Sequence, residues 1–221
     1  MPNCKKPDFS RAYSKANEIL MKSSVINTFP FSPKALVKEQ TPIVCRSYKK
    51  AKKYGIEMTD FGSESAIIMR LKGKSIIFYD ETKPETHNRF SILHELGHEV
   101  NEHDFTKKDD ETYHRYEVET NYFAAQLLMP EQLIRELQRR GVWITRYFLQ
   151  STFGVSGQAA DKRLDTLAKT NTEWRSRAEK EFDDIILFRY ANFLNTICPI
   201  RNTYDFEDEY ARQQERSSWY R

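Results

Sequence analysis

The chain has 221 residues, of which 39% are hydrophobic and 13% aromatic, and this length and composition allow it to bury a core. Its 35 basic and 32 acidic residues nearly balance, so the formal charge of +3 gives little reason to expect a nucleic-acid partner. The sequence has no apolar signal region, no stretch of roughly 18 apolar residues and no CxxC pair among Cys4, Cys45 and Cys198, which predicts a cytoplasmic protein without a membrane segment or a disulfide framework.

The first half of the chain predicts helices around a small sheet. Residues 8–22 carry apolar side chains at helical spacing and predict a first helix, with Asp8 or Ser10 available as its N-cap. Ser32 can cap a short helix that ends near Gln40. Residues 65–80 form two β-rich runs joined through a glycine, which indicates a hairpin. A long helix follows over residues 84–103, with a proline suited to its first position.

The second half is predicted to be entirely helical. One helix starts near Thr112 and ends before Pro130, which itself suits the first turn of the next helix. Residues 144–167 show a helix, a glycine turn, a serine cap and a second helix, and this order is typical of a helix-turn-helix. Residues 181–194 predict a last helix, followed by a polar tail. The predicted fold class is therefore α+β: a mostly helical body with a small antiparallel β-sheet, followed by helix-turn-helix-like and C-terminal helices.

The strongest chemical signal is an HExxH motif, His94-Glu95-Leu96-Gly97-His98, inside the long predicted helix. Four residues of α-helix turn through about 400°, so the two imidazoles lie on one face and can share a Zn²⁺ ion. Glu95 is about a quarter turn round the helix and can reach a metal-bound water as general base. Gly97 allows another segment to approach closely. An apolar stripe can hold this helix against the core: Phe90, Leu93, Leu96 and Val100.

A catalytic zinc takes three protein ligands and a water molecule, so one protein ligand lies outside the motif. The candidates downstream are Glu111, Glu117, Glu119, His103 and His114. On the helix after the acidic loop, Glu117 shares a stripe with Asn121 and two alanines that permit close packing, whereas Glu119 points about 200° away. We therefore expect Glu117 to complete the metal site and Asn121 to orient one of the ligands.

The group that stabilises the developing oxyanion or binds substrate stays open at this point. The side chains that can serve are His103, His114, Tyr113, Tyr116 and Tyr122. A histidine in a polar loop is more often a surface residue, so neither His103 nor His114 is favoured.

Two segments carry a family resemblance: RFSILHELGH and, after a loop, EVETNYFAAQLLMP. They resemble the ImmA/IrrE family of zinc metallopeptidases, most densely over residues 89–130. In that family the two histidines of the motif and the first glutamate of an ExxxN pattern bind zinc, which correspond here to His94, His98 and Glu117. Two departures are visible: HEVNEH stands where many members have an apolar run that ends in histidine, and Thr120 replaces a common alanine.

The resemblance implies a cytoplasmic protease, linked to mobile elements or stress responses, that cleaves a helix-turn-helix repressor. The predicted mechanism has Zn²⁺ acidify a water molecule while Glu95 takes its proton and passes it to the leaving amine. The predicted domains are a zinc metallopeptidase domain at 1–132, a helix-turn-helix-like segment at 133–170, and a C-terminal helix and tail at 171–221.

Two other classes of function remain as alternatives. The protein can be a regulator or a toxin–antitoxin-type binding protein with a structural zinc, which binds a repressor or DNA through residues 144–167. Lys162 and Arg163 are the obvious basic pair there, so nucleic acid is a conceivable partner but not the favoured one. The third class is a metal hydrolase that acts on a non-peptide bond.

Overall fold

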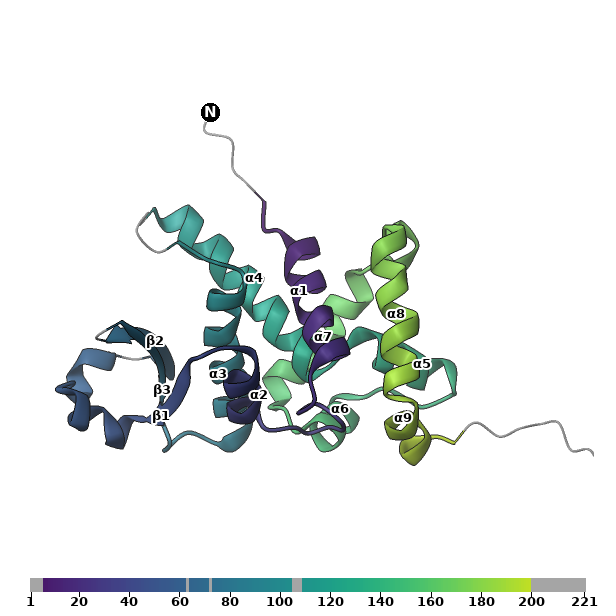
Figure 1. Cartoon of the computed structure of the whole chain (residues 1–221). Helices are drawn as coiled ribbons and strands as arrows, with labels where there is room; N and C mark the ends of the chain where they lie inside the picture. Colours follow the sequence, from purple (N-terminus) through teal and green to yellow (C-terminus); the bar gives the residue numbers. More distant parts are fainter. Residues whose placement is uncertain (1–5, 63, 72, 105–108, 200–221) are drawn as a thin grey trace, which may run out of the picture.

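A computed structural model describes residues 6–62, 64–71, 73–104 and 109–199. It confirms the α+β class, with a small sheet at one end of the molecule and most of the helices beside it (Figure 1). The elements of the first half are α1 (Phe9–Lys22), α2 (Pro33–Gln40), β1 (Val44–Ser47), the 3-10 helices η1 (Tyr48–Tyr54) and η2 (Met58–Phe61), β2 (Ala66–Leu71), β3 (Lys74–Tyr79) and α3 (Glu85–Val100). Those of the second half are α4 (Asp110–Leu128), α5 (Glu131–Arg139), α6 (Arg146–Phe153), α7 (Gly157–Lys169), the 3-10 helix η3 (Thr172–Trp174), α8 (Arg177–Arg189) and α9 (Ala191–Ile197).

Several helices begin at the residues that the sequence favours as caps. The side chains of Asp8, Ser32 and Ser156 each accept a hydrogen bond from a backbone N–H in the first turn of α1, α2 and α7. The sequence predicts the last helix as one element, but the structure has two, α8 and α9, because the chain leaves helical geometry at Tyr190. Tyr190 is buried, and its hydroxyl donates a hydrogen bond of 2.9 Å to the carbonyl oxygen of Leu20. This bond connects the break between α8 and α9 to the end of α1.

The sheet in the described residues has the strand order β1-β3-β2. The predicted hairpin is present, with β2 antiparallel to β3. The sheet is nevertheless mixed rather than wholly antiparallel, because β1 pairs with β3 in parallel, Val44 opposite Ile76. This order leaves β2 at an edge of the sheet, close to α3.

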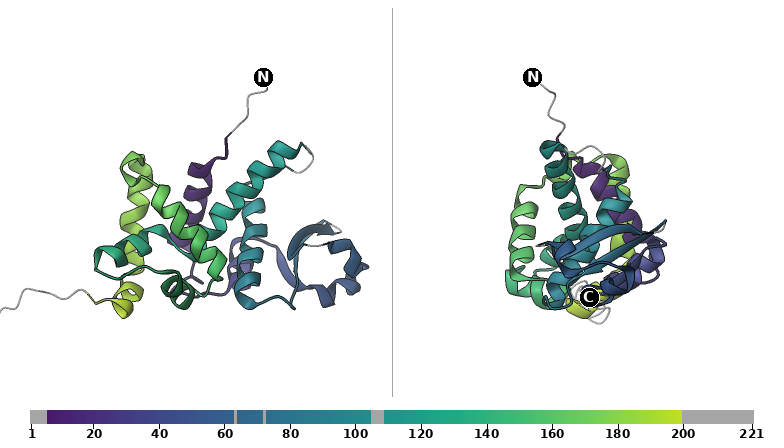
Figure 2. Two further views of the ribbon diagram at one scale, coloured as in Figure 1. Left: turned by 180° about the vertical axis from the view of Figure 1, so that it is seen from behind. Right: turned by 90° about the vertical axis from the view of Figure 1, so that its left-hand side faces the viewer.

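Helices α3 and α4 lie side by side across the middle of the molecule, and α1 packs on α4 and on α8 (Figures 1 and 2). The α3–α4 approach depends on Gly97, where a Cβ atom would lie 2.9 Å from Cδ1 of Phe123 and 3.2 Å from Cγ2 of Thr120. One continuous buried cluster runs from Ala12 in α1 to Leu194 in α9. The later helices therefore share the core of the helical body, and the division of the chain into three domains stays a prediction.

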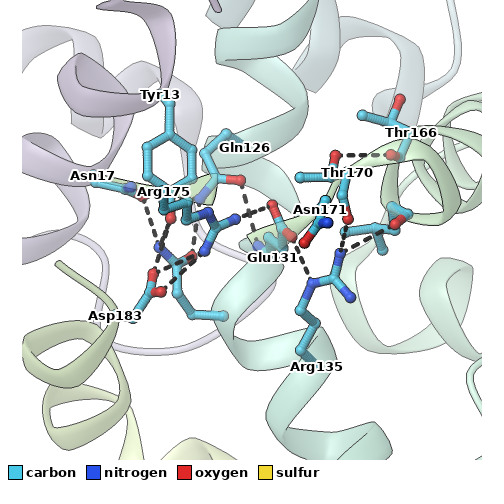
Figure 3. Close-up of polar contacts among 12 residues, drawn as sticks. Tyr13, Asn17, Gln126, Glu131, Arg135, Thr166, Thr170, Asn171, Arg175 and Asp183 are labelled. Atoms are coloured by element: carbon cyan, nitrogen blue, oxygen red, sulfur yellow. Dashed lines mark hydrogen bonds and ion pairs between the residues drawn. The ribbon is translucent and has the colours of Figure 1, made fainter. Parts of the chain in front are cut away.

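A buried polar network fastens the later helices to this body (Figure 3). Arg175, just before α8, forms an ion pair with Glu131 at the start of α5 and one with Asp183 of α8, and its guanidinium lies over the ring of Tyr13 in α1. Arg135 of α5 donates to two carbonyl oxygens at the C-terminal end of α7, and it pairs with Glu131 as well. Glu131 is buried and the side chain of Arg175 is largely buried, and buried charges are tolerated only when they are paired, so the network fixes the relative positions of α1, α5, α7 and α8.

Helices α6 and α7 form the predicted helix-turn-helix-like pair, turned at Gly154 in a left-handed conformation with φ of 63°. Arg163 of α7 is only 1% exposed, and its guanidinium donates to the carbonyl oxygen of Met129 and to the side chain of Gln126. One of the two basic residues that favoured DNA binding is therefore a core residue. No helix in the described part of the chain is long and apolar enough to cross a membrane.

Candidate active site

The HExxH helix borders a cavity of about 590 Å³ that opens between α3 and the edge strand β2. The described residues that line it come from the segment before β2 and its first residues, from α3 and from the first half of α4: Glu64, Ser65, Ala66, Ile67, Ile68, His87, Phe90, Ser91, His94, Glu95, His98, Tyr113 and Glu117. The cavity thus contains both motif histidines, the motif glutamate and the glutamate that we expected from α4.

Three side chains converge as a metal site requires. Nε2 of His94 lies 3.1 Å from Nε2 of His98 and 3.3 Å from one carboxylate oxygen of Glu117, and Nε2 of His98 lies 3.3 Å from the other oxygen. Ligand bonds of about 2.0–2.1 Å in a tetrahedron place neighbouring ligand atoms about 3.3 Å apart, so the donor set fits a zinc ion. Although burial raises the pKa of Glu117, hydrogen bonds with the two imidazoles hold it well below its usual range. The carboxylate is therefore ionised, as a metal ligand must be.

Glu95 lies beside this group on the next face of α3. Its Oε2 accepts a hydrogen bond of 2.9 Å from the backbone N–H of Ile68 in β2, which fixes the carboxylate between the helix and the edge strand. Burial raises the pKa of Glu95 to about 7, although His94 and the hydrogen bond from Ile68 act to lower it. A carboxyl group with this pKa can accept and release a proton near neutral pH.

Asn121 lies where the sequence predicts, one turn after Glu117. Its Oδ1 is 3.2 Å from Nδ1 of His94. When Nε2 of His94 faces a metal, Nδ1 carries the hydrogen and donates it to this oxygen. Asn121 can therefore hold the orientation of the His94 ring.

His98 is held by a different chain of contacts, for which the sequence gives no signal. Nδ1 of His98 lies 3.0 Å from Nδ1 of His103, and Nε2 of His103 lies 3.0 Å from Oε2 of Glu119. Burial, with the nearby His98 and two arginines, lowers the pKa of His103 to about 3, so this ring is neutral. It can then accept from His98 and donate to Glu119, whose other oxygen accepts from the N–H of Asp8 at 2.8 Å. We call His98, His103 and Glu119 the histidine relay.

The backbone after α3 explains how His103 reaches this position. Glu102 has φ of 56°, the left-handed region that few residues other than glycine adopt. The chain therefore turns back, and the N–H of His103 donates to the carbonyl oxygen of His98 at 3.1 Å. Glu119 points away from Glu117, as predicted, but its direction leads to His103 rather than to solvent.

The remaining candidates occupy different places. Tyr113 lines the cavity near Glu117, and Tyr116 stacks on His103 with 4.0 Å between ring centroids. Tyr122 faces a neighbouring cavity, while His114 and Glu111 are exposed and line neither cavity. Of the tyrosines and histidines considered for stabilising the oxyanion, Tyr113 is therefore the one that lies in the described lining of the active-site cavity.

Comparison with known proteins agrees with this geometry. The sequence model of the peptidase M78 family, described as an IrrE N-terminal-like domain, matches residues 50–165. No curated protein matches the chain at a significant level. The match extends from η1 to α7 and includes the HExxH helix, β2 and the helix that carries Glu117. Because it covers slightly more than half of the chain, and because it agrees with the resemblance to ImmA/IrrE proteins, this chain belongs to the IrrE N-terminal-like family of peptidases.

Proposed function

We propose that this protein is a zinc-dependent endopeptidase of the HExxH type, with His94, His98 and Glu117 as the ligands. The observation that carries the proposal is the convergence of these three side chains beside Glu95, in a cavity that is open along the edge of β2. A bound zinc ion would supply a Lewis acid for the peptide carbonyl and would acidify a water molecule.

Glu95 is the proton carrier in this proposal. It takes a proton from the attacking water and delivers it to the nitrogen of the scissile bond, so that the C–N bond breaks and the amine leaves. Its contact with the N–H of Ile68 keeps the carboxylate at one position beside β2 during both transfers. Asn121 and the histidine relay keep the two imidazoles in the tautomer that leaves Nε2 free for the metal.

The edge strand gives the substrate a place to bind. The N–H of Ile68 points away from β3 and toward Glu95, and β-strands repeat every two residues, so the backbone groups of Ala66 and Arg70 face the same side. An extended peptide can therefore add to β2 as a further strand, with its scissile bond beside Glu95. Such a site accepts an unfolded segment rather than a folded domain.

The substrate that we propose is a helix-turn-helix transcriptional repressor of a mobile element or a stress response. Family membership and the resemblance over residues 89–130 support this substrate class. Because the cleft takes extended backbone, we expect cleavage in an exposed loop or linker of the repressor, where local unfolding costs least.

The test is incubation of the zinc-loaded protein with helix-turn-helix repressors, beginning with any that a neighbouring gene encodes, followed by gel electrophoresis and mass spectrometry. We expect cleavage by the wild type, none after addition of a chelator, and a loss of at least about 100-fold in the Glu95→Gln variant, which keeps its zinc. Cleavage by Glu95→Gln at the wild-type rate would refute the mechanism. Cleavage of a peptide mixture without cleavage of the repressor would refute the substrate alone.

A further inference from the structure

A second cavity, of about 760 Å³, lies next to the active site. We call it the α7 groove, because α7 forms one wall while α1, α3 and α4 form the others. It shares two lining residues with the active-site cavity, His87 and Phe90, so the two cavities are separated only by the first turns of α3. Its volume lies within the range of about 300–1,000 Å³ that is usual for ligand sites, and it can hold several side chains.

The floor of the groove is apolar. Phe9 of α1 is 47% exposed, and its ring meets that of Tyr122 edge-on with 5.3 Å between centroids. Val118 and Ala125 of α4 and Ala159 of α7 add aliphatic surface. An exposed phenylalanine in a concave apolar site is the usual mark of a binding surface rather than of a solvated face.

The rim of the groove is positive. Lys162 and Lys169 are exposed on the same side of α7, two turns apart, and His87 lies on the opposite wall. The described residues that line the groove include no aspartate or glutamate. Since Arg163 is buried within the protein, the two lysines are the exposed lysine or arginine side chains of the described lining. Charge complementarity therefore favours a partner with carboxylates next to its apolar side chains.

We propose that the α7 groove binds a segment of the protein substrate that flanks the scissile bond and carries apolar side chains bordered by acidic ones. This inference rests on the proposed peptidase function and adds a second contact to it. A chain that lies along β2 and continues past Phe90 enters the groove directly, because both cavities use that residue. Binding there supplies affinity from residues remote from the reacting bond and selects one substrate among many unfolded segments.

The experiment measures binding without catalysis. The zinc-loaded Glu95→Gln protein is titrated into two fluorescein-labelled peptides of equal length, each with a central Leu and Phe cluster. One peptide has Glu residues on both sides of the cluster and the other has Lys, and binding is followed by fluorescence anisotropy. We expect the acidic peptide to bind at least about tenfold more tightly than the basic one, and this difference to shrink as salt is raised.

Variants of the groove then locate the binding. In the Glu95→Gln background, Lys162→Glu together with Lys169→Glu should weaken binding of the acidic peptide by about tenfold, since two rim charges are reversed. Phe9→Ser should weaken binding of both peptides, because it removes apolar surface. The matched control is Lys180→Glu on α8, an exposed lysine outside both cavities, which should change binding less than twofold. All of these side chains are exposed, and thermal melts check that each variant folds.

Three outcomes overturn the inference: equal binding of the two peptides, no effect of the charge reversal, or equal effects of the charge reversal and of Lys180→Glu. Binding of a labelled DNA duplex that is lost in the Lys162→Glu/Lys169→Glu protein, with no peptide binding, would assign the groove to nucleic acid and also overturn it. Because the readout is binding by a protein that lacks the general base, failure of the wild type to cleave any peptide would refute the peptidase function and leave this measurement intact.

Discussion

We expect the histidine relay to raise the zinc affinity of the proposed metal site. Changing His103 to Leu removes two hydrogen bonds, one that His103 accepts from His98 and one that it donates to Glu119. Each bond is 3.0 Å long, and the side chains of His103 and Glu119 are buried. Loss of one partner of a buried polar group costs about 1–3 kcal/mol. Because about 1.4 kcal/mol corresponds to a tenfold change in affinity, zinc should bind about 5- to 140-fold more weakly.

The assay is competition for zinc against a chromophoric chelator at neutral pH. The matched control is His114→Leu, which removes an exposed histidine from α4 and should leave zinc affinity unchanged. Glu119→Gln should give an intermediate loss, because a glutamine oxygen can still accept from His103 but carries no charge. A folded His103→Leu protein that binds zinc as tightly as the wild type would show that the relay does not hold His98, and the reasoning would be wrong.

Three further changes test other parts of the structure. The folded protein raises the pKa of Glu95 from 4.5 to about 7 and so binds this proton more tightly than the unfolded chain. The free energy of unfolding of the metal-free protein should therefore fall as pH rises from 4.5 to 7. Glu95→Gln should remove this fall, and urea unfolding at pH 7 should show the variant to be about 3 kcal/mol more stable than the wild type. Gly97→Ala places a Cβ atom 2.9 Å from the ring of Phe123. The crowding should cost about 1–3 kcal/mol, which exceeds the roughly 1 kcal/mol that alanine gains in helix propensity, so calorimetry should show a lower Tm. Arg175→Met removes the more deeply buried of the two ion-pair partners of Glu131 and should lower the free energy of unfolding by about 3 kcal/mol. Arg177→Met removes an exposed pair and should lower it by less than about 1 kcal/mol in the same urea titration.

Features that depend on local periodicity could be predicted from the sequence. The helix that contains His94 and His98, the caps at Asp8 and Ser32, and the face of α4 that carries Glu117 all follow from spacing along one element. The approach of α3 to α4 was also foreseeable, because Gly97 signals that another segment comes close.

Features that depend on pairing between distant segments could not be predicted in this way. The strand β1 has four residues, and its parallel partner β3 begins 27 positions after it ends, so no alternation marks it. The histidine relay depends on the left-handed conformation of Glu102, a residue type that gives no signal for it. Because this turn cannot be inferred from the sequence, the contact between Glu119 and His103 cannot be inferred from it either.

Helix α4 contributes residues to the candidate metal site, to the histidine relay and to the lining of the α7 groove. Glu117 faces the motif histidines, Glu119 faces His103, and Asn121 and Tyr122 border the α7 groove. Because Glu117 and residues of the α7 groove lie on this one helix, a rotation of α4 would displace the proposed metal site and the groove together. Farther along the helix, Gln126 donates to Asn17 of α1 and to Gln132 of α5 and accepts from Arg163 of α7, which restrains such a rotation from three sides. These contacts of Gln126 therefore help to hold Glu117 beside the motif histidines, although Gln126 does not line the active-site cavity.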